Sequence, residues 1–269
     1  MTDFEAKRRE LAETGVCVLP GILDRAEADR VRARLWEAAR ESERRGAATR
    51  NVGLDPNEHN VRVFNLLDLD AVFRDLIQHP VALRFVEGLL GPGFLVSNFT
   101  ANIALPGARS MKIHSDQGIV VPEPWERPWS INIIWCLNDI HERNGATRYL
   151  PGSHRFVREA EVPADAEARM VSFEAEAGSI LVMDGRVWHT SGSNVTADEE
   201  RALMFGYYSA DFLRPQMNWN ATLSPETIAG LSPELRALLG MDATANVRLA
   251  AERVLLTETG ADKIRLGAA

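Results

Sequence analysis

The sequence predicts a mainly β protein in which a sandwich or barrel of strands forms the core and helices pack outside it. From about residue 93, runs rich in β-branched and aromatic residues follow one another, separated by glycine and polar turns. No crossover helices separate these runs, which argues against a parallel doubly wound sheet. Helical patterns are confined to the two ends of the chain. We therefore expect a single domain over 1–269, with a helical N-terminal part at about 1–92, the β core at about 93–222 and a helical tail at about 223–269.

The N-terminal part reads as a series of helices with one early strand. The first helix, "DFEAKRRELAETG", should end at Gly15, and "VCVLPG" follows as a short strand. Asp24 and Glu27 resemble a capping box that begins the next helix. Residues 45–60 lack periodicity and predict a loop. Two further helices, "DLDAVFRDLIQ" and "VALRFVEGLL", should end at Pro80 and Gly91.

Four segments then predict strands of the core. They are "GFLVSNFTANIAL", "PWSINIIWCLNDI", "GSILVMDGRVWHTSG" and "RALMFGYYSADF". In the second segment the alternation places Ile131, Ile133 and Trp135 on one face. After these strands, "SPELRALLG" returns to a helical pattern.

The composition indicates a protein without a nucleic-acid or membrane partner. The chain is 45% hydrophobic and 25% charged, as in globular proteins, and its formal net charge is -8. Negative charge disfavours binding to nucleic acid or to an anionic membrane. No apolar run approaches the roughly 20 residues that cross a bilayer, and the charged N-terminus does not resemble a signal peptide. The two cysteines, Cys17 and Cys136, lie in apolar segments, so we expect buried thiols and a cytoplasmic location.

One short motif, His114-x-Asp116 in "MKIHSDQGIV", is a candidate metal site. In a strand, residues two apart point to the same side, so the imidazole and the carboxylate would lie together. His189 in "MDGRVWHTSG" is the best candidate for a third ligand, completing the 2-His-1-carboxylate set of non-haem iron. Zinc accepts the same donors, and such a pair also occurs by chance on ordinary strands.

A charged residue downstream strengthens this interpretation. Arg201 should begin the strand that follows the one bearing His189, and a guanidinium there could hold a carboxylate in two places. A metal with an arginine nearby fits a cosubstrate with an acid at one end and chelating oxygens at the other, as in 2-oxoglutarate. The alternative is an exposed Arg201 paired with Glu199 or Glu200.

The sequence resembles the phytanoyl-CoA dioxygenase family of Fe(II)/2-oxoglutarate oxygenases from about residue 10 to about residue 222. The resemblance rests on "KIHSDQG", "NGATRYLPGSHR" and "WHTSGSN" followed by Arg201, and extends to "TGVCVLPGIL", "NVRVFNLL" and "FLRPQMNW". It implies a double-stranded β-helix, a cupin-like jelly roll, with flanking helices. Met111 departs from the polar residue that some relatives have three positions before the first ligand.

The same resemblance implies a catalytic centre. It implies that His114, Asp116 and His189 bind Fe(II), and that Arg201, helped by Thr147, binds the cosubstrate 2-oxoglutarate, with O2 as the oxidant. Halogenating relatives have Gly or Ala at the carboxylate position, so Asp116 favours a hydroxylase or a related oxidase.

We therefore expect a dioxygenase that hydroxylates or otherwise oxidises a small, largely apolar molecule in natural-product biosynthesis, releasing succinate and CO2. A homodimer is the expectation from similar proteins. Three alternatives stay open: a non-catalytic metal-binding cupin-like protein, a zinc hydrolase on the same scaffold, and an oxygenase of a free amino acid or small polar metabolite. The candidate substrate-pocket walls are Asn98, Asn102, Ile119, Val121, Trp125 and Trp219.

Overall fold

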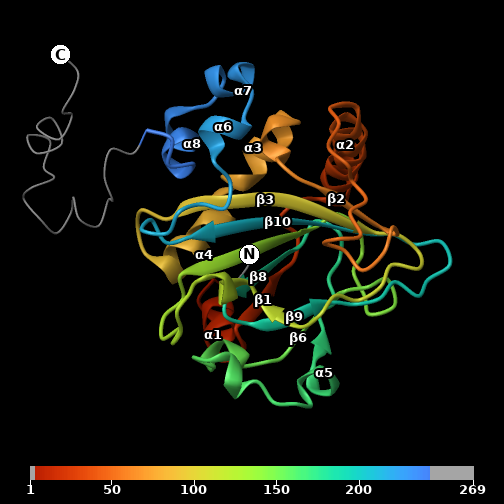
Figure 1. Ribbon diagram of the computed structural model, residues 1–269, viewed down its shortest axis with the longest axis vertical. Coiled ribbons are helices and arrows are strands. Elements are labelled where there is room, and N and C mark those ends of the chain that lie inside the picture. Colours follow the sequence, from red (N-terminus) through yellow and green to blue (C-terminus); the bar gives the residue numbers. More distant parts are fainter. Residues whose placement is uncertain (1–3, 243–269) are drawn as a thin grey trace, which may run out of the picture.

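Two antiparallel sheets form the centre of the molecule in a computed structural model, which describes residues 4–242 (Figure 1). The larger sheet has the order β1-β8-β5-β10-β3-β2, and the smaller has the order β4-β9-β6-β7. The strands are β1 Val16–Leu19, β2 Asn60–Val63, β3 Leu95–Ala104, β4 His114–Ser115, β5 Ser130–Cys136, β6 Thr147–Tyr149, β7 Val171–Ser172, β8 Ile180–Asp184, β9 Trp188–Ser191 and β10 Arg201–Ser209.

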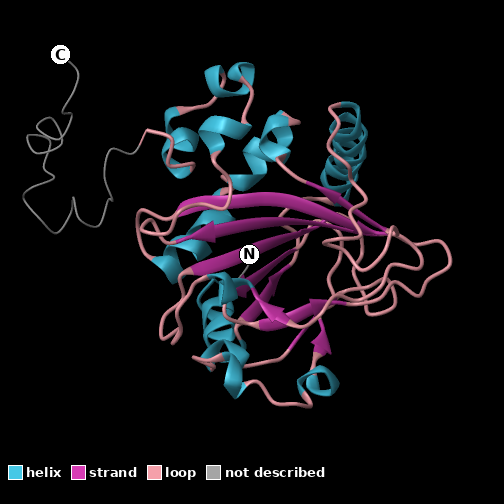
Figure 2. Cartoon of the chain, in the orientation of Figure 1, coloured by secondary structure: helices cyan, strands magenta, loops and turns pink. Residues whose placement is uncertain are grey.

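Helices flank this pair of sheets, as Figure 2 shows in cyan. Helices α2, α3, α6, α7 and α8 lie on the side of the large sheet that faces away from the small one (Figure 1). The helices are α1 Phe4–Thr14, α2 Arg25–Arg44, α3 Ala71–Ile77, α4 Pro80–Leu90, α5 Ala166–Arg169, α6 Trp219–Thr222, α7 Pro225–Ala229 and α8 Pro233–Leu238.

The predicted elements of the N-terminal part are confirmed. Helix α1 ends where Gly15 takes a φ of +86°, a conformation that favours glycine. Asp24 and Glu27 form the expected capping box at the start of α2. The predicted loop over 45–60 needs one correction, because Asn60 opens β2, which pairs with β3 at the edge of the large sheet. The helical tail is described only as far as α8, and its remainder, 243–269, lies outside the described residues.

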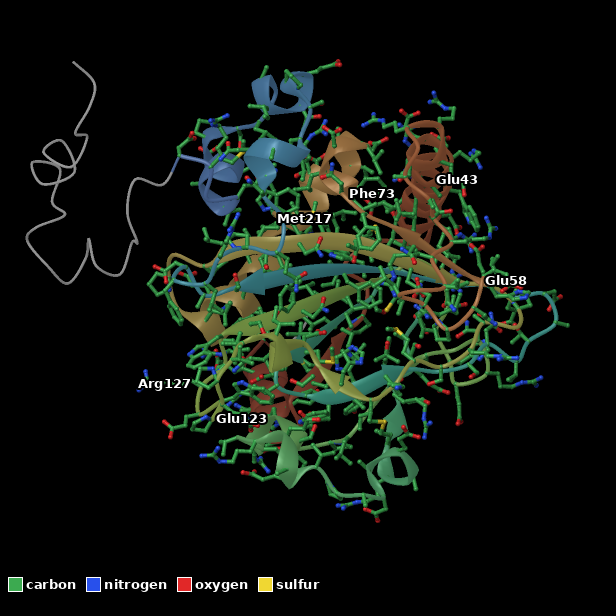
Figure 3. All side chains as sticks on the ribbon, in the orientation of Figure 1. Glu43, Glu58, Phe73, Glu123, Arg127 and Met217 are labelled. Atoms are coloured by element: carbon green, nitrogen blue, oxygen red, sulfur yellow. The ribbon has the colours of Figure 1, made fainter. Side chains whose placement is uncertain are left out.

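The two faces of the large sheet carry two separate cores. Ile131, Ile133 and Trp135 point outward and pack with the helices. Phe73 of α3 belongs to this outer core and lies beside the sheet in Figure 3. Residues of opposite parity, among them Ile134, point inward and fill one end of the space between the sheets. The other end holds the cavity described below.

Cys17 and Cys136 are free, buried thiols, as expected. Burial raises the pKa of the Cys17 thiol to about 12 and that of the Cys136 thiol further, so both are protonated at neutral pH. None of the helices between residues 4 and 242 has the length and apolar composition needed to cross a membrane.

Candidate active site

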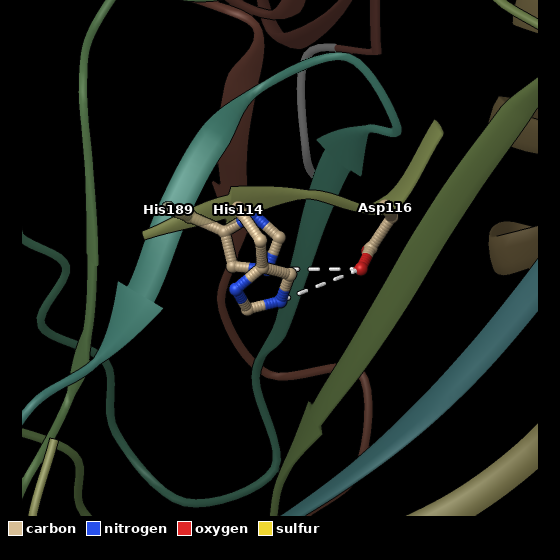
Figure 4. Close-up of side chains that lie close together, drawn as sticks. All are labelled: His114, Asp116 and His189. Carbon is tan, nitrogen blue, oxygen red and sulfur yellow. Dashed lines mark ion pairs between the residues drawn. The ribbon is translucent and has the colours of Figure 1, made fainter. Parts of the chain in front are cut away.

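Three candidate metal ligands converge at the edge of the small sheet. His114 on β4 and His189 on β9 are directly paired across the two strands, and their rings lie 4.4 Å apart (Figure 4). One ligand atom from each of His114, Asp116 and His189 lies within 4.8 Å of the others. Asp116 does not continue the strand as the strand-spacing argument assumed. It begins a 3-10 turn, Asp116–Ile119, which redirects its carboxylate toward the two imidazoles.

The imidazoles are oriented to bind a metal through Nε2. His114 Nδ1 lies 2.9 Å from the Lys112 carbonyl oxygen and His189 Nδ1 lies 2.9 Å from that of Val187, so each Nδ1–H donates and each Nε2 keeps its lone pair. Asp116 Oδ1 lies 3.9 Å from His114 Nε2 and 3.8 Å from His189 Nε2. Two ligand bonds of about 2.0–2.2 Å can span these separations, so the donor set fits one ion.

The electrostatics of His189 suit a ligand. Burial lowers its pKa most, the Asp116 carboxylate opposes this shift, and His114 lowers the pKa further. The ring is therefore neutral at physiological pH, which is the form that coordinates a cation.

Two side chains from the large sheet hold Asp116 in place. Asn132 on β5 donates from Nδ2 to Asp116 Oδ2 at 3.0 Å, which leaves Oδ1 for the metal. Tyr207 on β10 donates its hydroxyl to the Asp116 backbone carbonyl at 3.1 Å. Burial, with the Asp116 charge second, raises the pKa of Tyr207, so the phenol stays a donor. Sequence reasoning missed both residues. The available signal was an inward-facing asparagine in an otherwise apolar strand.

The ligand-bearing turn is also fixed to Gly185, after the end of β8. The Gly185 carbonyl accepts from Ser115 Oγ at 2.9 Å and from the Gln117 backbone at 2.7 Å. Its own amide donates to the Ser130 carbonyl at 3.0 Å. A Cβ at this position would lie 1.9 Å from Ser130 Oγ, so only glycine allows this close approach.

A buried guanidinium lies in the same cavity as the triad. Arg201 is 1% exposed and begins β10, as predicted. Its guanidinium pairs with neither Glu199 nor Glu200. Among the described residues it bonds only Asn102, at Oδ1 (3.0 Å) and at the carbonyl (3.4 Å), while its Nε has no partner. Burial lowers the pKa of Arg201 to about 10, and the nearby Arg62 charge adds to this effect. The guanidinium is thus charged, desolvated and short of a carboxylate partner, as expected of an anion site.

Arg62 on β2 also reaches this cavity. It forms a two-pronged ion pair with the buried Asp55, with Nη2 to Oδ1 at 2.5 Å. Its Nη2 also lies 3.9 Å from Met111 Sδ, so Met111 occupies the cavity wall beside it.

These groups line one cavity of about 220 Å³ between the sheets. Thr147 lines it from β6, and Asn98 and Asn102 line it from β3. The remaining lining residues are Arg62, Phe64, Thr100, Met111, His114, Asp116, Asn132, His189, Ser191, Phe205, Tyr207 and Gln216.

Four of the expected pocket walls lie elsewhere, which corrects those assignments. Trp219 is buried in the outer core, where its Nε1 donates to the Val96 carbonyl. Trp125 is buried against its own loop, with its Nε1 donating to the Val120 carbonyl. Ile119 and Val121 are 60% and 79% exposed and do not line the cavity. Residue type alone did not reveal these positions, because apolar side chains also fill cores and loops.

Comparison with known proteins assigns the chain to a family. Residues 11–202 match the family model described as phytanoyl-CoA dioxygenase (PhyH). The chain belongs to the phytanoyl-CoA dioxygenase family. Curated relatives include dioxygenase af480 of Aspergillus fumigatus, which is 51% identical over 89% of this chain and 77% of the relative. Dioxygenase FUM3 of Gibberella moniliformis is 31% identical over 76% of this chain and 71% of the relative. This member of the phytanoyl-CoA dioxygenase family is therefore a 2-oxoglutarate-dependent dioxygenase, and the non-catalytic alternative is set aside.

Solved structures confirm the double-stranded β-helix fold of this phytanoyl-CoA dioxygenase family member. HygX of Streptomyces hygroscopicus, solved with nickel, 2-oxoglutarate and hygromycin B, superposes with a TM-score of 0.64 at 18% identity over 80% of this chain and 90% of HygX. The carbocyclase SnoK from nogalamycin biosynthesis also gives a TM-score of 0.64, at 21% identity over 87% of this chain and 92% of SnoK.

Proposed function

We propose that this chain uses Fe(II) held by His114, Asp116 and His189 to couple the oxidation of a small organic molecule to the conversion of 2-oxoglutarate and O2 into succinate and CO2. The observation that carries the proposal is the buried, carboxylate-free Arg201 in the cavity that the ligand triad also lines. A cation at the triad and a guanidinium on the opposite sheet match the two ends of a keto diacid.

The residues that line the cavity have separate roles in this proposal. Arg201 and Thr147 would hold the distal carboxylate of 2-oxoglutarate, while the triad leaves positions on the iron for the keto acid. Asn132 and Tyr207 fix the carboxylate ligand. When bound, the iron and the keto acid would supply the oxidising chemistry, while the chain's own residues hold and orient them.

The proposed role is in the biosynthesis of a natural product. Support comes from the fungal dioxygenases among the relatives and from structural neighbours that act in nogalamycin biosynthesis or bind hygromycin B. The expected substrate was largely apolar. The cavity combines Phe64, Phe205 and Met111 with amide and hydroxyl groups, which favours an apolar molecule that also carries polar substituents.

The test is succinate formation from 2-oxoglutarate in air, with the metal varied. Anaerobically prepared protein loaded with Fe(II) should form succinate slowly without added substrate, and Zn(II) should suppress this. His114→Ala should form none. If the zinc form were a hydrolase, or the iron form released no succinate, the proposal would be wrong.

A further inference from the structure

A row of polar side chains crosses the large sheet on its cavity face. Asn98 on β3 is paired with Tyr207 on β10, which in turn is paired with Asn132 on β5. Paired residues in antiparallel strands point to the same side, and all three line the cavity. Asn132 and Tyr207 bond Asp116, but Asn98 does not. Asn98 is therefore the member of the row that has no role at the metal ligands.

Asn98 instead pairs with a second amide at the cavity wall. Its Nδ2 donates to Gln216 Oε1 at 2.9 Å. Asn98 Oδ1 is buried and has no hydrogen-bond partner, and Gln216 Nε2 bonds no described residue. The pair thus presents one free acceptor and one free donor. Turning both amides by 180° exchanges the two roles but still leaves one of each.

We propose that the Asn98–Gln216 pair is a specificity subsite for a substrate hydroxyl group, so that the substrate of this dioxygenase is an alcohol. A hydroxyl donates and accepts at once, so it satisfies both free groups. A ketone, an ether or a carboxylate only accepts, and a hydrocarbon does neither. With the two amides oriented as described, each of these would leave the buried carbonyl of Asn98 without a donor, at a cost of about 1–3 kcal/mol. The inference rests on the proposed function, because it concerns the same cavity.

The subsite also places the hydroxyl away from the oxidised carbon. Asn98 and Asn132 are two strands apart, which separates their Cα atoms by roughly 10 Å at about 4.8 Å per strand. Asn132 contacts the metal ligand Asp116, so Asn98 lies on the far side of the cavity. Phe205, one row along β10, is an apolar wall for the molecule's body. The alcohol is therefore an anchor, and a different carbon faces the metal.

The test compares alcohols with analogues that cannot donate. Menthol, borneol and cyclooctanol are each matched with the corresponding ketone and methyl ether. Binding to protein loaded with Zn(II) and 2-oxoglutarate is measured by saturation-transfer NMR, which needs no turnover. At least one alcohol should bind roughly tenfold more tightly than its ketone and its ether, as expected for one satisfied buried group.

Two variants test whether the preference for an alcohol over its ketone and ether arises at the Asn98–Gln216 pair. Asn98→Leu and Gln216→Leu should each reduce it to about twofold or less. Asn220→Leu, which replaces an exposed amide that bonds no other side chain in the described part of the chain, should keep it. Gln216 is exposed, so its substitution does not threaten the fold and remains informative if Asn98→Leu is unstable. The proposal is overturned if no alcohol outbinds its ether, or if the preference survives Gln216→Leu. Succinate formation without any alcohol separately tests the proposed function.

Discussion

At the scale of single residues, the site depends on side chains that fix the metal ligands as much as on the ligands themselves. The Asp116 side chain is 18% exposed, its Oδ2 is held by Asn132 and its backbone carbonyl by Tyr207. The Asn132 bond favours the rotamer in which Oδ1 faces both imidazoles, and the Tyr207 bond fixes the backbone that carries it. Partners of this kind set the affinity of a metal site because they remove the freedom that binding would otherwise have to restrict.

Asn132→Leu tests this positioning role. The substitution keeps the size of the side chain and removes the donor, so Mn(II) should bind roughly 10–100-fold more weakly. Calorimetric titration of the metal-free protein measures the dissociation constant. Circular dichroism and the melting temperature check that the sheet is intact. An unchanged dissociation constant would show that Asp116 is held by other means.

Residue types predicted the ligands but not their supports. His114, Asp116, His189 and Arg201 carry chemistry that is recognisable in the sequence, and their order along the chain matches a known family. The roles of Asn132 and Gln216 depend on strand register and on contacts between distant segments. No local pattern encodes these relations, so the supports could be found only from the structure.

At the scale of elements, two short segments set the geometry of the candidate metal ligands. The segment HSDQG, residues 114–118, is held through Gly185. The turn PGSH, residues 151–154, connects β9 with α1. Ser153 Oγ in that turn accepts from the Trp188 backbone at 2.9 Å, beside His189. His154 donates through Nε2 to the Ala12 carbonyl at 3.1 Å, at the end of α1. The most recognisable part of the family resemblance thus supports a ligand-bearing strand.

Gly185→Ala should disturb the fold and the metal site together. The added Cβ would lie 2.8 Å from the Ser130 carbonyl oxygen, so the backbone must shift, at a cost of about 1–3 kcal/mol. The shift also moves the carbonyl that holds Ser115 and Gln117. We expect a lower melting temperature and weaker Mn(II) binding. Gly230→Ala is the control, because its Cβ would meet nothing closer than 3.6 Å. Equal melting temperatures and equal Mn(II) affinities for the two variants would contradict the role assigned to Gly185.

His154 should make the fold sensitive to mild acid. Burial lowers its pKa below the ordinary 6.5, the Asp184 charge opposes this shift, and Arg186 and Arg155 add to it. The unfolded chain therefore takes up the proton first as the pH falls. The His154 contribution is fully present above about pH 6.5 and decreases below it.

Urea unfolding of His154→Gln tests this prediction. Glutamine keeps an amide donor toward Ala12 but does not titrate. The free energy of unfolding of the wild type should fall more steeply between about pH 7.5 and about pH 5.5 than that of the variant. Parallel slopes for the two proteins would mean that other groups cause the acid sensitivity.

Element prediction succeeded where the pattern is local. Glycine stops, the capping box and alternating strands were found because neighbouring residues determine them. Strand β2 was missed because a four-residue edge strand is defined by its pairing with β3. The 3-10 turn at Asp116 was missed because, besides the local bond from Val120 to Gln117, it depends on a bond from the Gln117 backbone to the distant Gly185.

At the scale of the whole molecule, the two sheets contribute different halves of the site. The small sheet and its turn carry the metal ligands, and β10 of the large sheet carries Arg201. A keto diacid bound to both would connect the sheets across the cavity. The fold class was predictable from composition and alternation, but the polarity of the cavity was not. The expected homodimer, cytoplasmic location and single domain remain predictions.

Joint occupancy of the site should therefore stabilise the fold. Mn(II) alone should raise the melting temperature, and 2-oxoglutarate should raise it further only when the metal is present. A ligand at one hundred times its dissociation constant adds about 2.7 kcal/mol. For a chain of this size that corresponds to roughly 5–10 °C. Differential scanning fluorimetry measures both increments. Equal stabilisation by 2-oxoglutarate with and without metal would contradict a bridging site.

The most direct test of the central claim is an anaerobic titration of the Fe(II)-loaded protein with 2-oxoglutarate. The titration is monitored through the charge-transfer absorption of the iron–keto acid chelate. The wild type and the exposed-site control Arg40→Met should develop the band at one equivalent. Arg201→Met should develop the same band but need at least roughly 30-fold more 2-oxoglutarate, as expected for one or two lost charge-assisted hydrogen bonds. His114→Ala should show no band. A band that forms normally in His114→Ala, or an unchanged requirement in Arg201→Met, would contradict the account.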